Sequence, residues 1–176
     1  DALPIYNTNT RPDGDRTLEN EFTDILNIGK IFDVQDKAQA IVDDAKAVID
    51  KTLTATADVK DKPSVMVLEP LGDDITNYGV KSLGGDMVTQ LGATLANPDA
   101  STVGKEDIIA ANPDVIFVVY MPYAGDDPET VKNSQLAVIQ DDESLKSLDA
   151  VKNGRVYPIM LSEMYASATR TQDGRS

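Results

Sequence analysis

The sequence predicts an α/β fold, in which a three-layer lobe with a mostly parallel sheet flanked by helices is preceded by one long helix. Two observations support this prediction. The apolar run Val115–Val119 does not alternate with polar residues, which is typical of a strand buried on both faces of a sheet. From residue 64 onward, strand patterns are separated by helix patterns, and this arrangement favours parallel strands joined by right-handed crossovers.

The first part of the chain predicts two helices. Residues 17–31 carry apolar side chains on one side, and Gly29 is expected to end this helix. From Asp36 to about Ala57, apolar residues recur with the i, i+3, i+4, i+7 spacing of an amphipathic helix. At 1.5 Å per residue, this helix would run roughly 30 Å. The charged residues 58–63 then break the helical pattern.

The lobe that follows is expected to contain three strands and four helices. The strands are residues 64–69, 115–120 and 155–159, and the helices are residues 83–91, 105–111, 128–133 and 144–151. Asp127 followed by Pro128 is a helix start with a cap and a proline in the first turn. Asn112-Pro113 stops the preceding helix, and Asn153-Gly154 is a tight turn before the last strand. Residues 162–176 are polar and lack a closing apolar helix.

Composition limits the function classes. The formal net charge is −14, which argues against nucleic acid and anionic membrane surfaces as partners. The chain has no histidine, so it lacks the commonest proton-transfer residue and the commonest transition-metal ligand. It has no cysteine, which excludes thiolate catalysis and disulfides. No run of eighteen apolar residues occurs. We therefore predict no catalytic residues, no metal site and no resident cofactor.

Tyrosines at or just beyond predicted strand ends are the main candidates for ligand contact: Tyr78, Tyr120, Tyr123 and Tyr165. Ligands of open α/β sheets bind outside the carboxyl ends of the strands. Tyr123 follows the central strand directly, in the segment Met121–Gly125, and is the best single candidate. A tyrosine in such a place is about as often structural as ligand-facing, so both roles remain open.

Gly84-Gly85 and Gly92 bracket a short helix. Their spacing matches neither a dinucleotide fingerprint nor a phosphate-binding loop. A helix with glycine at both ends is the favoured interpretation. The functional alternative is that residues 82–85, which begin with Ser82, expose free amides to an anionic ligand.

Glu106 lies near the start of the predicted helix 105–111, on its polar and outward face. On residue chemistry alone it is a solvated first-turn residue that favours the helix dipole. A carboxylate at a fixed place on a rigid lobe is also a handle for a partner.

Taken together, several segments resemble the substrate-binding proteins of ABC importers. The resemblance is to the class whose two α/β lobes are joined by one long helix and which captures iron–siderophore complexes, haem or cobalamin. The matching segments occur in the family's order over about residues 22–175; they are Ile28–Ala38, Gly84–Gly92, Val103–Ile116 and Leu148–Tyr157.

The resemblance implies a division of the chain. Residues 1–31 would be a remnant of the first lobe, residues 32–62 the long linking helix, residues 63–160 the second α/β lobe and residues 161–176 a return segment. The chain would then be a fragment that holds only half of the ligand cleft.

The resemblance also assigns roles to residues. Glu106 occupies the place of the family's exposed docking glutamate, which pairs with arginines of the ABC permease. Tyr165 and Arg170 fall in the return segment, as lip residues for an anionic or aromatic ligand. Without histidine, haem ligation would fall to tyrosine or methionine. The predicted ligand-binding residues are Tyr78, Ser82, Met121, Tyr123, Tyr165 and Arg170.

The implied function is that of an extracytoplasmic solute-binding component, in the periplasm or as a cell-surface lipoprotein. It would touch the membrane only through an anchor absent from this chain. It would be a binding protein and not an enzyme. A chelatase-like metal or tetrapyrrole enzyme of related fold would be expected to use His or Cys, which this chain lacks. A non-catalytic interaction domain is the second alternative.

Overall fold

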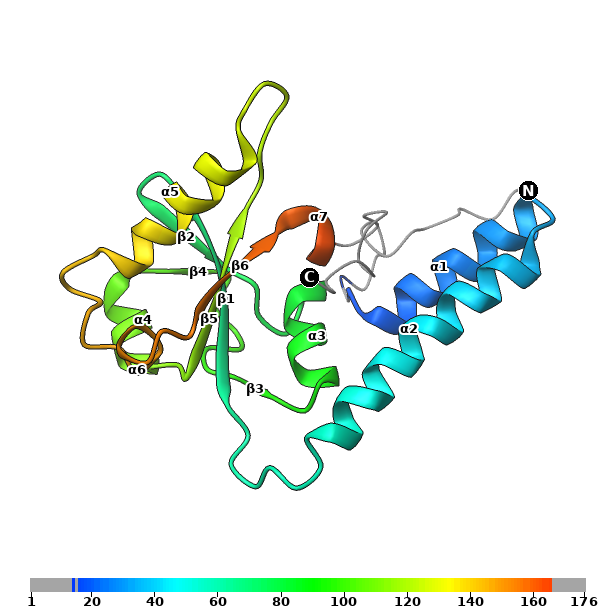
Figure 1. Ribbon diagram of the computed structural model, residues 1–176, viewed down its shortest axis with the longest axis horizontal. Coiled ribbons are helices and arrows are strands. Elements are labelled where there is room, and N and C mark those ends of the chain that lie inside the picture. Colours follow the sequence, from blue (N-terminus) through cyan, green and yellow to red (C-terminus); the bar gives the residue numbers. More distant parts are fainter. Residues whose placement is uncertain (1–13, 15, 166–176) are drawn as a thin grey trace.

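A six-stranded mixed sheet forms the centre of the lobe in the computed structural model, which describes residues 14 and 16–165 (Figure 1). The strand order is β4-β2-β1-β5-β6, and β3 pairs with β1. The strands are β1 (Ser64–Leu71), β2 (Asp74–Asn77), β3 (Thr94–Leu95), β4 (Thr102–Val103), β5 (Val115–Tyr120) and β6 (Val156–Met160). The three predicted strands are therefore present, with shifts of one or two residues at some of their ends.

Three of the five strand pairings are parallel, which confirms the mostly parallel sheet. β5 pairs with β1 and β6, and β3 pairs with β1, all in parallel. The antiparallel part was not predicted. It begins with a hairpin in which Leu71 pairs with Asp74 across a two-residue turn, and Gly72 adopts a positive φ of 66° there. β2 then pairs antiparallel with β4 at the edge.

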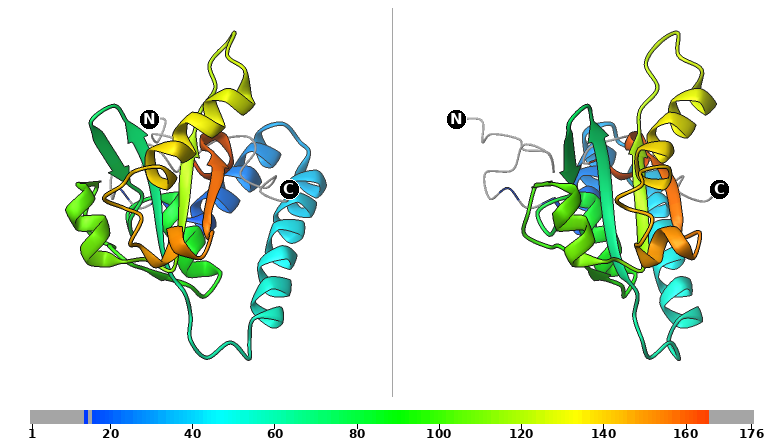
Figure 2. Two further views of the ribbon diagram at one scale, coloured as in Figure 1. Left: turned by 60° about the vertical axis from the view of Figure 1, so that its left-hand side comes forward. Right: turned by 90° about the vertical axis from the view of Figure 1, so that its left-hand side faces the viewer.

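Helices cover both faces of the sheet (Figure 2). They are α1 (Leu18–Ile31), α2 (Gln35–Ala55), α3 (Leu83–Gln90), α4 (Lys105–Ala111), α5 (Pro128–Gln140), α6 (Asp149–Lys152) and α7 (Leu161–Met164). Alternate residues of each strand point to opposite faces, so one strand serves two cores. Met66 and Leu68 of β1 pack with α4, α5 and the residues around α6, whereas Val65 and Val67 pack with α3 and α7.

α1 and α2 form a helical hairpin that extends away from the lobe (Figure 1). The prediction that Gly29 ends the first helix is wrong, because α1 continues to Ile31. Gly29 is buried where the helices meet, and a Cβ at this position would overlap the Cβ of Ala38. The glycine thus serves close helix packing. Thr17 caps α1 by accepting a hydrogen bond from the Asn20 amide.

Two helices of the lobe differ from the prediction. α5 extends to Gln140 and not only to residue 133, because Ile139 is fully buried against the sheet and tertiary packing outweighs the weak helix preference of the polar residues before it. The expected helix 144–151 is mostly absent, and only Asp149–Lys152 is helical. Asp142 accepts hydrogen bonds from both the amide and the hydroxyl of Ser144, which favours a turn.

α2 lies inside the predicted linking segment 32–62, and its 21 residues run roughly 30 Å. The division of the chain into lobes stays a prediction. α7 was not predicted and occupies the first residues of the expected return segment 161–176. Arg170 lies outside the described residues.

Candidate functional site

The candidate site lies at the edge of the sheet where the parallel strands end. The register pairs Tyr120 of β5 with Met160 of β6, so the segments that follow these two strands leave the sheet side by side. β1 reaches the same edge, since Leu68 pairs with Val118 and the strand continues to Leu71. We call this the carboxyl edge. It is the usual place for ligands of open α/β sheets.

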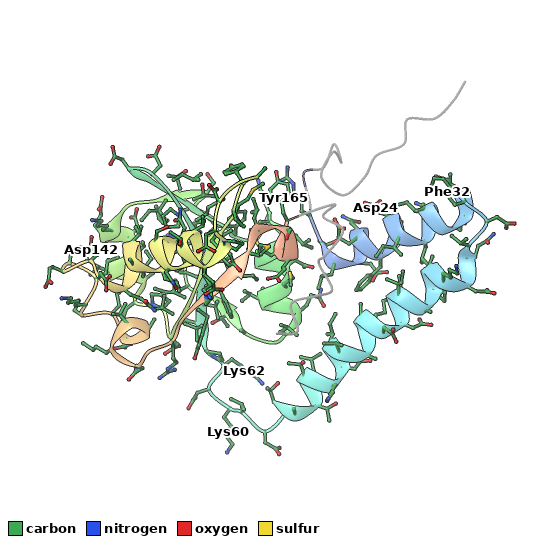
Figure 3. The ribbon with its side chains drawn as sticks, turned by 45° about the horizontal axis from the view of Figure 1, so that its top comes forward. Asp24, Phe32, Lys60, Lys62, Asp142 and Tyr165 are labelled. Carbon is green, nitrogen blue, oxygen red and sulfur yellow. The ribbon has the colours of Figure 1, made fainter. Side chains whose placement is uncertain are left out.

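A cavity of about 260 Å³ opens at the carboxyl edge, and we call it the edge cavity. Its lining comes from the segment after β5 and from the end of β6 and α7: Met121, Pro122, Met160, Leu161, Ser162 and Tyr165. Two predicted ligand residues, Met121 and Tyr165, therefore meet around one space. Each is 43% exposed, so both side chains remain accessible. Figure 3 shows Tyr165 just beyond α7, on the side of the lobe that faces α1.

Tyr123 is presented by a hydrogen-bonded turn in the loop between β5 and α5. Its amide donates to the Asp126 carboxylate at 2.8 Å, and the Asp126 amide donates back to the Tyr123 carbonyl at 3.0 Å. The Tyr123 side chain is 69% exposed and does not line the edge cavity. Asp127 then caps α5 through the amide and hydroxyl of Thr130. These hydrogen bonds hold the pKa of Asp127 below its usual range, so the cap stays ionised.

Tyr78 was expected at the carboxyl edge because it follows a predicted strand end, but it lies farther back along the sheet. It follows β2, which runs antiparallel to β1, so its amide bonds to the Val67 carbonyl beside the middle of β1. Its phenol donates to the Glu69 carboxylate at 2.5 Å. Burial, this hydrogen bond and the charge of Glu69 all raise the pKa of Tyr78 well above its ordinary value. Tyr165 adds a smaller contribution through its own charge.

Ser82 acts as the N-cap of α3. Its hydroxyl accepts from the Gly85 amide at 3.0 Å and donates to the Gly79 carbonyl at 2.8 Å. Gly84 and Gly85 are buried, and a Cβ on Gly85 would overlap the Gly79 carbonyl. This arrangement favours the structural interpretation of the glycine pair, namely close packing at a capped helix start. A ligand-binding role for Ser82 stays a prediction.

A second cavity, of about 240 Å³, lies between the sheet and the helices α3 and α7. Its lining is almost entirely apolar and includes Val67, Val88, Phe117 and Met164. It adjoins the smaller of the two cores.

Glu106 lies in the first turn of α4, which stands at the opposite end of the molecule from the α1–α2 hairpin (Figure 1). The neighbouring Asp107 is used as a cap, because its carboxylate accepts from the Gly104 amide at 2.9 Å. Glu106 is exposed and forms no ion pair with another residue of the described range. Its carboxylate lies over Gly104, so that a Cβ added to Gly104 would come within 2.7 Å of a carboxylate oxygen of Glu106. The charge is therefore available at the surface.

The start of α4 is tied to the loop between α5 and α6. Lys105 forms an ion pair with Asp142 at 2.5 Å, and Asp142 also accepts from Ser144. These contacts lower the pKa of Asp142 to about 2, with the Lys105 hydrogen bond as the largest cause. In Figure 3, Asp142 and Tyr165 lie on opposite sides of the lobe. The Glu106 region and the edge cavity are thus separate surfaces.

Sequence reasoning missed Glu69 and the residues 160–162 at the edge cavity. The rule that ligands bind beyond strand ends, which selected Tyr123, also applies to the residues that follow the last strand. Glu69 carried no such signal, because its pairing with Tyr78 depends on the unpredicted hairpin.

No helix between residues 16 and 165 combines the length and apolar character that a membrane span requires. No group of three or more acidic or other metal-ligating side chains is arranged to hold a metal ion within the same range.

Comparison with known proteins identifies a matching family and a named relative. The sequence pattern of the family described as periplasmic binding protein matches residues 3–160. The petrobactin-binding protein YclQ of Bacillus subtilis is 31% identical over 159 residues, which are 85% of this chain and 47% of that protein. The chain thus spans about half the length of this curated relative.

Solved structures share the fold. A periplasmic binding protein from Veillonella parvula matches with a TM-score of 0.84 and 23% identity, over 96% of this chain and 52% of the other. An ABC-type Fe³⁺-hydroxamate transport system protein from Saccharomonospora viridis matches with a TM-score of 0.76 and 22% identity, over 95% and 57%. The family match covers most of the sequence, and the curated relative is a binding protein and not an enzyme. The chain belongs to the periplasmic binding protein family.

Proposed function

We propose that this chain supplies one lobe of an extracytoplasmic solute-binding protein that delivers a metal chelate to an ABC importer. The chelate would be an iron–siderophore, haem or cobalamin-type complex, held between this lobe and a companion lobe. The observation that carries the proposal is the edge cavity, where Met121 and Tyr165 meet at the carboxyl edge. Family membership and the petrobactin-binding relative support the same solute class.

The edge cavity suits one side of a cleft better than a closed binding site. Its lining is mainly apolar and includes the exposed ring of Tyr165, and it opens to solvent. Tyrosine offers a large apolar face together with a hydroxyl, so Tyr165 and Tyr123 can contact both the organic frame and the polar groups of a chelate. We propose that these two tyrosines are the main contacts supplied by this lobe.

The ligand contacts are tested in the full-length protein by titration with a panel of ferric chelates, haem and cobalamin. Tyr123→Ala and Tyr165→Ala are expected to weaken binding about tenfold or more, since each removes an exposed aromatic contact. Tyr157→Ala is the matched control, because Tyr157 is 45% exposed but lies near the start of β6, away from the carboxyl edge. If both test variants bind as the control does, the assignment of the cleft is wrong.

We further propose that Glu106 docks on the permease by pairing with arginine side chains. Its exposure, its lack of an ion pair within the described residues and its distance from the hairpin support this role. An arginine guanidinium binds a carboxylate through two parallel hydrogen bonds, which gives both strength and orientation.

Docking is tested by transport with the full-length protein. Glu106→Ala and the charge-only variant Glu106→Gln are expected to lower uptake while leaving chelate affinity unchanged. Asp50→Ala, on the exposed face of α2, serves as the control for loss of a carboxylate. Normal uptake in both Glu106 variants, or a loss of chelate binding, would contradict the docking role.

A further inference from the structure

The carboxyl edge is strongly acidic. Three segments build it: residues 69–74 around the hairpin, residues 121–127 after β5 and residues 160–165 after β6. Together they contain six carboxylates and neither lysine nor arginine; the carboxylates are Glu69, Asp73, Asp74, Asp126, Asp127 and Glu163.

The stretches that follow two of these segments add little positive charge. Lys81 follows in the exposed loop that leads to α3 and contributes one positive charge. Lys132, in α5, forms an ion pair with Glu129 at 2.5 Å, so the pair adds no net charge. By formal count, the three segments together with Lys81 therefore keep a net negative charge of several units.

Hydrogen bonds fix several of these carboxylates in place. Glu69 accepts from the Tyr78 phenol, Asp126 accepts from the Tyr123 amide, and Glu163 accepts from the Met160 amide at 3.1 Å. An ionised carboxylate accepts such bonds better than a neutral one. The charges of these three carboxylates are thus held at fixed places in the fold.

Aromatic faces accompany the negative charge. Tyr165 lines the edge cavity and Tyr123 stands exposed on the adjacent loop. The face of an aromatic ring attracts cations, ammonium groups above all. Carboxylates and aromatic faces together attract a positively charged solute and repel an anionic one.

We propose that the solute carried by this protein is a chelate of neutral or positive net charge, one whose singly charged donors just balance the ferric ion or one that also carries an ammonium group, and not a polyanionic ferric catecholate. This inference rests on the proposed solute-binding function and specifies its ligand class. The edge cavity with Tyr165 would hold the organic frame, while the surrounding carboxylates would select for charge.

The experiment compares three probes on the full-length protein at low and high salt. The probes are a neutral ferric trihydroxamate, a ferric trihydroxamate bearing one free ammonium group, and a trianionic ferric tris-catecholate. The expected order of affinity is cationic, then neutral, then trianionic, with about tenfold or more between the first and the last. High salt should weaken binding of the cationic probe, because it screens exposed charges.

Charge-removing variants test whether the carboxylates of the carboxyl edge cause this order of affinity. Asp126→Asn and Glu163→Gln together keep the hydrogen-bond acceptors but remove two charges. We expect this double variant to bind the cationic probe about fivefold more weakly and the trianionic probe more tightly. Glu143→Gln is the control, since Glu143 is paired with Lys146 in the loop after α5, at the opposite edge of the sheet. It should change neither affinity.

The outcomes separate the two proposals. Tightest binding of the trianionic probe, or no response to the double variant, would overturn the inference about charge and leave the solute-binding function standing. Failure of the full-length protein to bind any chelate, haem or cobalamin would overturn the proposed function itself.

Discussion

Tyr78 is expected to stay protonated at a pH at which an ordinary tyrosine ionises. Its phenol is half-buried and donates to Glu69, and the desolvation, the hydrogen bond and the charge of Glu69 all favour the neutral form. The ordinary pKa of tyrosine is about 10. Tyr78 therefore holds its proton in the folded chain above this pH, whereas in the unfolded chain it loses it.

This difference makes stability depend on pH in a defined direction. Below about pH 10 both states are protonated and the stabilising contribution is complete. Above that pH the unfolded state binds fewer protons than the folded state, so the free energy of unfolding falls, by at most about 1.4 kcal/mol per pH unit. Because the phenol is only partly buried, solvent screens part of this effect, and we expect a loss of about 1–1.5 kcal/mol by about pH 11.5.

Two measurements check the prediction on the chain itself. Ultraviolet absorbance of tyrosinate, followed against pH, should show ionisation at unusually high pH, and Tyr78→Phe should remove that late phase. Denaturant unfolding between about pH 9 and 11.5 should show a smaller loss of stability for Tyr78→Phe than for the unsubstituted chain, since phenylalanine has no proton to lose. Tyr157→Phe should behave as the unsubstituted chain does.

The reasoning is refuted if Tyr78→Phe and the unsubstituted chain lose stability equally over this pH range. The outcome also bears on function. A tyrosine that keeps its proton can donate a hydrogen bond to Glu69, but it cannot offer a phenolate oxygen to ferric iron. Among the predicted ligand residues, Tyr78 would then order the site without contacting the metal.

Two further predictions concern the framework of the lobe. Gly85→Ala should destabilise the fold by about 1–3 kcal/mol in denaturant unfolding, despite the better helix preference of alanine, because its Cβ would overlap the Gly79 carbonyl. Thr89→Ala, on the exposed side of α3, is the control. A Gly85→Ala variant as stable as the unsubstituted chain, or more stable, would contradict this close packing. Asp142→Asn should make the free energy of unfolding fall less steeply as the pH is lowered from about 4 towards 2. The lowered pKa of Asp142 stabilises the fold at pH values above the ordinary aspartate pKa of about 3.9, and this stabilisation is lost as the pH falls to about 2. Identical acid unfolding curves for the variant and the unsubstituted chain would contradict a contribution from the Lys105 ion pair.

The long or strongly patterned elements could be predicted from the sequence. The buried strand Val115–Tyr120 and the helix Lys105–Ala111 have the expected bounds, since an unbroken apolar run and an Asn-Pro stop are local signals. Asn112 adopts the left-handed conformation as the C-cap of α4, which explains why the helix ends there. The apolar stripe of α2 likewise set its length to within a few residues.

The short strands escaped prediction because two to four residues carry too little periodicity. A signal for the hairpin was nevertheless present. Gly72-Asp73 between Leu71 and Asp74 is a two-residue turn of the kind that joins antiparallel strands, and it conflicts locally with the expectation of a parallel sheet. This omission had a consequence at the site, because the hairpin brings Tyr78 to Glu69.

The candidate site was predictable only in part. The rule of strand ends placed Met121 and Tyr165 near one edge, but it did not show that they line one cavity whereas Tyr123 stands apart on its own turn. Such details depend on loop hydrogen bonds, which periodicity does not report. The role of Glu106 rests on family resemblance together with its exposure, and it stays a prediction.

The hairpin of α1 and α2 acts geometrically as a lever. It contacts the lobe at its base, where the Leu18 amide donates to Asp86 of α3 at 2.7 Å, and its turn near Phe32 lies farthest out (Figure 3). With α2 roughly 30 Å long, a rotation of about 10° at the base would carry the turn through about 5 Å. Small adjustments in the packing of α3 would therefore be magnified at the far end of the hairpin. The carboxylate of Asp86, in the first turn of α3 and bonded to the first residue of α1, lies at the base of this lever.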